Sequence, residues 1–147
     1  MAGWIFERAM GLTERVLRHW AELGGAVEAA RMGGGGHTGG GASGHSFVSD
    51  PTALAAVRAV DGVGRVTLAD GVYLRQPEAW LQVLGLVFDR SDSLVQAIVR
   101  RRYFLREGHV RTVTELPISD RSYYSLLEDF RTAVTLAAVQ EGLLKVF

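Results

Sequence analysis

Apolar residues recur every three or four positions at the start of the chain, which predicts one amphipathic helix over residues 3–32. The two heptad positions of this pattern are held by Ala9, Val16, Leu23 and Ala30 and by Phe6, Thr13, Trp20 and Val27. Acidic and basic residues, Glu14 among them, alternate over the remaining positions, as is typical of a solvated outer face. The apolar seam faces either the protein's own core or a second copy. A bend is expected near Gly24, because glycine disfavours helix.

The periodic pattern disappears over residues 33–48, where glycine dominates. Gly-rich chain behaves as a flexible coil, so this stretch is predicted to be a linker. It lacks the Lys-Ser/Thr pair of a Walker phosphate loop, and no predicted strand precedes it, as the Rossmann fingerprint would need. We therefore expect an N-terminal amphipathic helix at 1–32, a linker at 33–48 and a helical domain at 49–147.

Past the linker, the pattern alternates between helical and strand-like segments. Ser49-Asp50-Pro51 is a typical helix start, and residues 65–75 surround Asp70-Gly71 with β-favouring residues, which predicts a small hairpin. Pro77 opens a further helix, after which Asp92 is expected to cap the next one. The buried stripe of the helix that Pro77 opens is predicted to be Trp80, Leu81, Leu84, Val87 and Phe88. The fold class expected is mainly α, a helical bundle with one possible hairpin.

The segment from about residue 94 to 140 predicts a helix-turn-helix. Apolar residues at 94, 95, 98, 99 and 103 describe one helix, and a short helix follows from about Val110 to Leu116. Pro117-Ile118-Ser119 then breaks the pattern, and Ser119 or Asp120 is expected to cap a long final helix. Its inner stripe is predicted to be Tyr123 or Tyr124 followed by Leu127, Phe130, Val134, Ala137 and Ala138. Ile118 would plug the turn between the two helices, and the second helix could then enter a major groove of DNA.

Short polar side chains and an arginine lie at the start of that second helix, where they could reach base edges and phosphates. The predicted DNA-binding residues at this end are Arg121, Ser122, Tyr124 and Ser125. The residues expected to hold the phosphate backbone are Arg111, Thr112, Arg100, Arg101 and Arg102. Alternatively, the three consecutive arginines only solvate one face of a helix.

Overall charge adds little drive toward nucleic acid. The chain has 147 residues, with Lys+Arg 16 balancing Asp+Glu 16, but residues 90–119 carry six arginines against three acidic residues. Positive charge is therefore concentrated at the predicted module. The chain contains no cysteine, which excludes disulfides and thiolate metal sites, and it has no catalytic motif. We expect no catalysis, no metal and no cofactor.

The absence of a long apolar run or a secretory signal leads us to expect a cytoplasmic protein without a membrane partner.

Three motifs, in order, resemble the RinA/ArpU-type phage transcriptional regulators. They are S-D-P-T-A-L-A-A-V-R at 49–58, I-V-R-R-R-Y-F at 98–104 and E-L-P-I-S-D-R-S-Y-Y at 115–124. The C-terminal module of that family is similar to region four of bacterial sigma factors. The resemblance implies a phage or prophage regulator of late genes that binds double-stranded DNA through the helix-turn-helix.

A neutral monomer should bind DNA weakly, so we expect a homo-oligomer or recruitment by RNA polymerase. Dimerisation would use helix 3–32 or the C-terminal helix. Two alternatives stay open. One is a phage DNA-packaging component, such as a small terminase subunit, in which a ring of subunits multiplies weak contacts. The other is a helix-turn-helix repurposed for protein contacts, with Tyr123, Tyr124 and the C-terminal L-L-K-V-F docking a partner.

Overall fold

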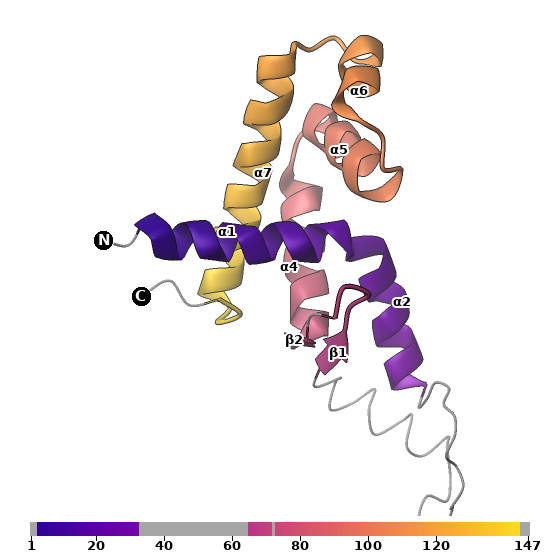
Figure 1. Cartoon of the computed structure of the whole chain (residues 1–147), viewed down its shortest axis with the longest axis vertical. Coiled ribbons are helices and arrows are strands. Elements are labelled where there is room, and N and C mark those ends of the chain that lie inside the picture. The colour runs from indigo at the N-terminus through magenta and orange to yellow at the C-terminus, as the bar shows by residue number, and fades with distance from the viewer. Residues whose placement is uncertain (1–2, 33–64, 72, 145–147) are drawn as a thin grey trace, which may run out of the picture. The chain divides into compact units, whose positions relative to one another are not determined.

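The computed structural model describes residues 3–32, 65–71 and 73–144, and it confirms a mainly α fold with one small hairpin. The elements are α1 (Gly3–Arg18), α2 (Trp20–Arg31), β1 (Arg65–Thr67), β2 (Tyr73–Arg75), α4 (Pro77–Arg90), α5 (Ser93–Val99), the π-helical turn η2 (Arg100–Phe104), α6 (His109–Glu115) and α7 (Asp120–Gln140) (Figure 1). The predicted linker at 33–48 and the helix expected after Ser49 lie outside the described residues. No described helix combines the length and the apolar character that crossing a lipid bilayer requires.

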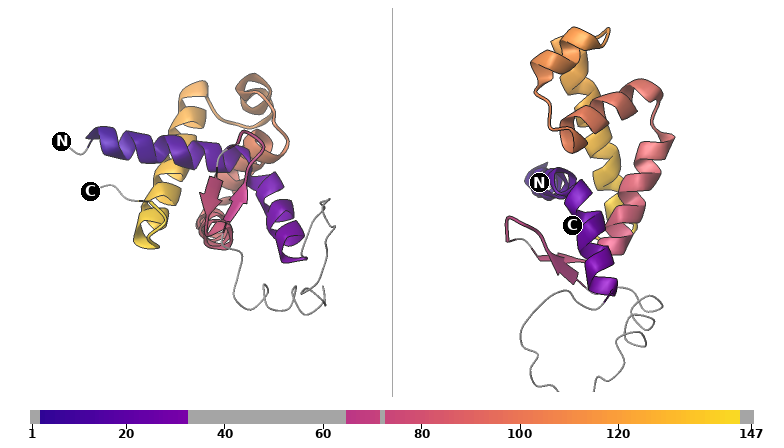
Figure 2. Two further views of the ribbon diagram at one scale, coloured as in Figure 1. Left: turned by 60° about the horizontal axis from the view of Figure 1, so that its bottom comes forward. Right: turned by 90° about the vertical axis from the view of Figure 1, so that its right-hand side faces the viewer.

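The chain divides into two compact units, of which the first takes residues up to Ala21 and from Ala79 onward. In this unit α1 lies across α7, and both α5 and α6 pack against α7 (Figures 1 and 2). The largest fully buried side chains of this unit include Trp80, Leu84, Ile98, Tyr123 and Leu17. These residues come from α1, α4, α5 and α7, so one core joins the N-terminal helix to the C-terminal module.

The N-terminal segment is two helices, and the prediction of one helix bent at Gly24 is wrong. The break falls at His19, whose N–H donates to the carbonyl of Val16 (3.0 Å), a tighter turn than the α-helix makes. Trp20 packs against Phe88 and Phe104, with ring centroids 5.9 and 4.9 Å away. Contact between this half-buried ring and the two phenylalanines outweighs the helix preference of the local sequence, and Gly24 lies within α2 without breaking it.

The seam of α1 faces the core of its own unit. Ala9, Thr13 and Val16 are buried, as predicted, and so is Leu17, which the heptad pattern does not include. Glu14 departs from the expectation of a solvated face, because its side chain is only 13% exposed. This part of the predicted seam is therefore used within the chain.

The second unit, Glu22–Glu78, contains the rest of α2 and the predicted hairpin. Strands β1 and β2 pair antiparallel, with Val66 opposite Leu74 and both side chains buried. Gly71 has φ of +88°, which glycine adopts without steric cost, and its N–H donates to the carbonyl of Leu68 (2.8 Å). The Asp70-Gly71 turn is thus where the sequence predicts it.

The helices that precede the C-terminal module start largely as predicted. Trp80 and Leu84 of the α4 stripe are buried, as is Val83, whereas the other three predicted members are half-buried. The Asp92 side chain caps α5 by accepting a hydrogen bond from the N–H of Val95 (2.9 Å). After α5 the helix widens into η2, where the Leu105 N–H reaches back five residues to the carbonyl of Arg100 (3.0 Å).

Candidate nucleic-acid interface

A sharp turn separates α6 from α7, as the sequence predicts. The Leu116 N–H closes the last turn of α6 on the carbonyl of Thr112 (2.9 Å), and the Ile118 N–H donates to the carbonyl of Leu116 (2.8 Å). Pro117 between them is exposed, whereas Ile118 is half-buried. The two helices are therefore distinct elements with an apolar residue in their elbow.

Ser119 fixes the start of α7. Its backbone is extended, and its side-chain oxygen accepts a hydrogen bond from the N–H of Ser122 (3.1 Å). The Tyr123 N–H donates to the carbonyl of Ser119 (2.9 Å), so the helical ladder begins at once. Such a cap satisfies one of the free amides at a helix start and holds the first turn in place.

The leading turn of α7, residues 120–125, has one buried side and one exposed side. Tyr123 is fully buried, which decides the predicted choice between Tyr123 and Tyr124 for the inner stripe. Arg121, Ser122 and Ser125 are exposed, and Tyr124 is 48% exposed. The structure therefore brings the four predicted residues of this helix together on one surface.

Contacts between aromatic rings support this exposed surface. The rings of Tyr123 and Tyr124 meet edge to face with centroids 5.0 Å apart, and the His109 ring lies 5.4 Å from that of Tyr124. His109 is the first residue of α6, so these ring contacts join the start of α6 to the start of α7. The buried position of Tyr123 also removes it from the alternative in which it docks a partner.

On α6, the two predicted backbone contacts have different environments. The Arg111 side chain is 68% exposed and pairs with Glu115 one turn later (3.3 Å), an exposed pair that is readily exchanged. Thr112 is fully buried, and its hydroxyl lies 3.4 Å from the carbonyl of Gly108. The prediction that Thr112 contacts phosphate is wrong, because one side of this short helix must pack against α7.

The three consecutive arginines, residues 100–102, have different partners. Arg101 binds two carboxylates, Glu107 at 3.3 Å and Glu115 at 2.6 Å, and the hydrogen bond to Glu115 is the main reason that the pKa of Arg101 is raised. The same hydrogen bond lowers the pKa of the Glu115 carboxyl group, with Arg111 adding to the effect. Arg101 is therefore held by acidic partners within the chain.

Arg102 is also engaged inside the molecule. One of its Nη atoms lies 3.5 Å from the Tyr123 hydroxyl and the other 3.8 Å from a carboxylate oxygen of Glu14. Arg100, in contrast, is exposed and lies over the Phe88 ring, 5.5 Å from its centroid. Of the three arginines, Arg100 alone is exposed and has no carboxylate partner among the described residues.

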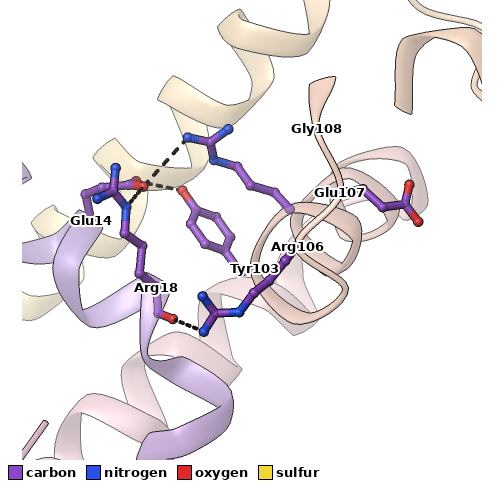
Figure 3. A pocket seen from close by; sticks show the side chains of 7 residues that line it. Glu14, Arg18, Tyr103, Arg106, Glu107 and Gly108 are labelled. Atoms are coloured by element: carbon purple, nitrogen blue, oxygen red, sulfur yellow. Dashed lines mark hydrogen bonds and ion pairs between the residues drawn. The ribbon is translucent and has the colours of Figure 1, made fainter. Parts of the chain in front are cut away.

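Sequence reasoning missed a polar cluster centred on Glu14. The Tyr103 hydroxyl donates to the Glu14 carboxylate (2.7 Å), and Arg18 lies 3.1 Å from the same group (Figure 3). Arg131 (3.2 Å) and Arg102 (3.8 Å) are its further cationic neighbours. Burial, together with this neighbouring carboxylate, raises the pKa of the Tyr103 phenol above its usual value. The i,i+4 spacing of Glu14 and Arg18 was the only local signal, since Tyr103 and Arg131 are distant in sequence.

Comparison of the chain with protein-family models, with curated proteins and with solved structures gives no match. Among the described residues, no group of three or more histidine and acidic side chains is placed to hold a metal ion.

Proposed function

We propose that this protein binds double-stranded DNA by placing the leading turn of α7 in the major groove, as a phage or prophage transcriptional regulator. The observation that carries the proposal is the exposure of Arg121, Ser122 and Ser125 on a turn whose other side is anchored by buried Tyr123. A capped helix start that projects an arginine and two hydroxyls has the donors and acceptors that base edges and phosphates require.

Few cations support this contact. Arg111 of α6 would exchange its exposed partner Glu115 for a phosphate, and Arg100 is exposed. Arg101 and Arg102 are occupied by acidic and phenolic partners of the same chain. Further along α7, Glu128 and Asp129 are exposed and would repel a duplex, so the contact is confined to the leading turn. A single copy should therefore bind weakly.

A second copy would supply the missing contacts, and the surface that fits it is the α4–α7 groove. This groove is lined by Val83, Leu86, Val87, Arg90, Ser91, Ala133, Leu136, Ala137, Gln140 and Glu141. Leu86 and Leu136, exposed to 46% and 51%, lie together in this groove, and neighbouring exposed apolar side chains of this kind mark interaction surfaces. The helices run antiparallel (Figure 1), so Arg90 and Glu141 lie toward opposite ends of the groove.

That arrangement suits a two-fold dimer. A two-fold axis across the groove would bring Arg90 of each copy to Glu141 of the other, and the leucines of both copies together. Neither of these charged side chains has an ion-pair partner in the part of the chain that the structure describes. A dimer of this kind would carry two leading turns, one from each copy.

Selection of preferred sequences from a random duplex pool, followed by gel-shift titration, tests the DNA proposal. Arg121→Ala and Arg111→Ala should each weaken binding, whereas Arg75→Ala is the matched control, because Arg75 is an exposed arginine on the hairpin. Circular dichroism of each variant checks that the helices remain. Unchanged binding by both α6 and α7 variants, or failure to enrich any sequence, would contradict the proposal.

A further inference from the structure

The Glu14 cluster borders a cavity of about 240 Å³ that the DNA-binding proposal does not use. It is lined by Glu14, Arg18, Arg102, Tyr103, Arg106, Glu107 and Gly108, which come from α1, η2 and the loop before α6 (Figure 3). Ligand pockets for drug-sized molecules occupy roughly 300–1,000 Å³, so this one suits something smaller. Three arginines in the wall of so small a cavity indicate that its ligand is an anion.

The charges around the cavity leave a positive surplus. The single carboxylate of Glu14 is shared among Arg18, Arg102 and Arg131, and it also accepts the hydrogen bond from Tyr103. Arg131 has a second carboxylate partner in Glu128 (2.5 Å), so the Glu14 carboxylate is the one negative charge that serves two arginines of the cavity wall, Arg18 and Arg102. A second negative charge at this point would be stabilised rather than repelled.

The other acidic residue in the wall does not offset this surplus. Glu107 accepts from Arg101 (3.3 Å), and its side chain points away from Glu14 (Figure 3). The ion-pair partner of Glu107 is thus an arginine outside the cavity wall. Positive charge in the cavity is therefore not neutralised from that side.

Arg106 is the residue most available to a ligand. Its guanidinium donates to the main-chain carbonyl of Arg18 (3.1 Å), and among the described residues it has no carboxylate partner (Figure 3). The backbone of Arg106 has φ of +56°, a left-handed conformation that a residue with a long side chain rarely adopts. This conformation places the side chain against the end of α1, with one side of the guanidinium fork engaged and donors left over.

We propose that this cavity, the anion pocket, binds a small phosphate-type dianion through Arg106 and Arg18, with the guanidinium of Arg102 adding positive charge to the wall. The planar guanidinium groups match the oxygens of a tetrahedral anion in a bidentate manner. Such a ligand would join the end of α1 to the loop that leads into α6. The proposal is independent of DNA binding, because the leading turn of α7 contributes no residue to the pocket.

Isothermal titration calorimetry of the full chain with inorganic phosphate and with pyrophosphate, at fixed ionic strength in chloride buffer, tests this proposal. We expect saturable binding of one anion per chain. Arg106→Gln should weaken it by about tenfold or more, as expected for the loss of a hydrogen bond to a charged group. Arg106→Lys, which keeps the charge but not the fork, should recover only part of the affinity, and Arg75→Gln on the hairpin should have no effect.

Melting temperatures of the free variants confirm that each is folded. Absence of saturable binding, or equal losses in Arg106→Gln and Arg75→Gln, would overturn the proposal. Phosphate groups also occur in DNA, so the same variants are titrated with duplex. If Arg106→Gln weakens duplex binding while free phosphate and pyrophosphate bind to neither protein, the surface contacts the DNA backbone and the small-anion proposal is wrong. If the anions bind but no duplex does, the pocket stands and the DNA proposal fails.

Discussion

The hydroxyl of Thr135 lies 2.8 Å from the hydroxyl of Thr13, and both side chains are fully buried. The Thr135 hydroxyl is also 2.8 Å from the carbonyl of Arg131. A carbonyl oxygen only accepts and a hydroxyl has a single proton, so Thr135 donates to the Arg131 carbonyl and accepts from the Thr13 hydroxyl. This polar pair sits where α1 crosses α7 and joins two segments more than a hundred residues apart in sequence.

Replacing one threonine of this pair should lower the free energy of unfolding at least as much as replacing both. Thr135→Val leaves the Thr13 hydroxyl buried without its partner, and we expect a loss of about 1–2 kcal/mol in the free energy of unfolding. The double variant Thr13→Val/Thr135→Val should be no less stable than Thr135→Val, because two isosteric apolar groups replace the pair. Urea unfolding of the four proteins measures the coupling. Strictly additive losses would show that the two hydroxyls do not interact.

The N-cap of α7 should contribute to stability through its side chain alone. Ser119→Ala removes the oxygen that accepts from the Ser122 N–H, and we expect a loss of about 1 kcal/mol. Ser119→Asn supplies an equivalent acceptor and should stay within a few tenths of a kcal/mol of the parent. Ser125→Ala, on the exposed face of the same helix, serves as control. Equal losses in the Ala and Asn variants, measured by denaturant unfolding, would assign the effect to packing.

Ionisation of Tyr103 should make the free energy of unfolding lower in alkaline solution than at neutral pH. Its phenol has a raised pKa in the folded state, so above about pH 10, where tyrosine in the unfolded chain ionises, the unfolded state holds fewer protons. The free energy of unfolding should therefore fall with rising pH, by up to about 1.4 kcal/mol per pH unit from this group.

Tyr103→Phe tests that assignment. At neutral pH it should cost about 1–2 kcal/mol, because the hydrogen bond to the Glu14 carboxylate is lost. Its alkaline decline should be shallower than that of the parent when urea midpoints are compared from about pH 8 to about pH 11. Parallel declines in the two proteins would mean that Tyr103 does not titrate differently on folding.

Arg121 and Arg111 should affect DNA binding in different ways. Arg111 is proposed to contact phosphate, so Arg111→Ala should weaken binding to all duplexes alike and reduce the slope of log affinity against log salt by about 0.9. Arg121, in the leading turn, should contact a base edge, and Arg121→Ala should relax sequence preference by about 1–3 kcal/mol. Fluorescence anisotropy with the selected duplex and a scrambled one, over a salt series, separates the two effects. If both variants reduce the salt slope equally and neither changes the preference for the selected duplex over the scrambled one, base contact by Arg121 is excluded.

The sequence predicts the local features of this fold well because each has a local cause. The Asp70-Gly71 turn, the caps at Asp92 and Ser119 and the elbow at Ile118 depend on residues within a few positions of one another. The period of apolar residues likewise predicts the buried stripe of α7. The caps, the turns and the helices of the C-terminal module could therefore be predicted from the sequence alone.

The departures from prediction come from contacts between distant segments. His19 interrupts the N-terminal helix because the Trp20 ring packs against Phe88 and Phe104. Glu14 has the pattern of a surface residue, yet Tyr103 and Arg131 enclose it from the other end of the chain. Thr112 is polar and still buried. Heptad position and residue type do not show which segment will cover a given face.

A charge exchange across the α4–α7 groove tests the dimer. Arg90→Glu and Glu141→Arg should each place like charges together at both ends of the proposed interface and shift the population toward monomer. The double variant restores opposite charges and should recover the dimer. Such a recovery would show that the single variants lose the dimer through charge repulsion and not through misfolding. Leu136→Asp should abolish the dimer, whereas Arg75→Glu on the hairpin should leave it intact. Sedimentation velocity over a range of concentrations gives the mass of each protein. A parent that stays monomeric, forms a ring, or keeps its mass in all variants would contradict this interface.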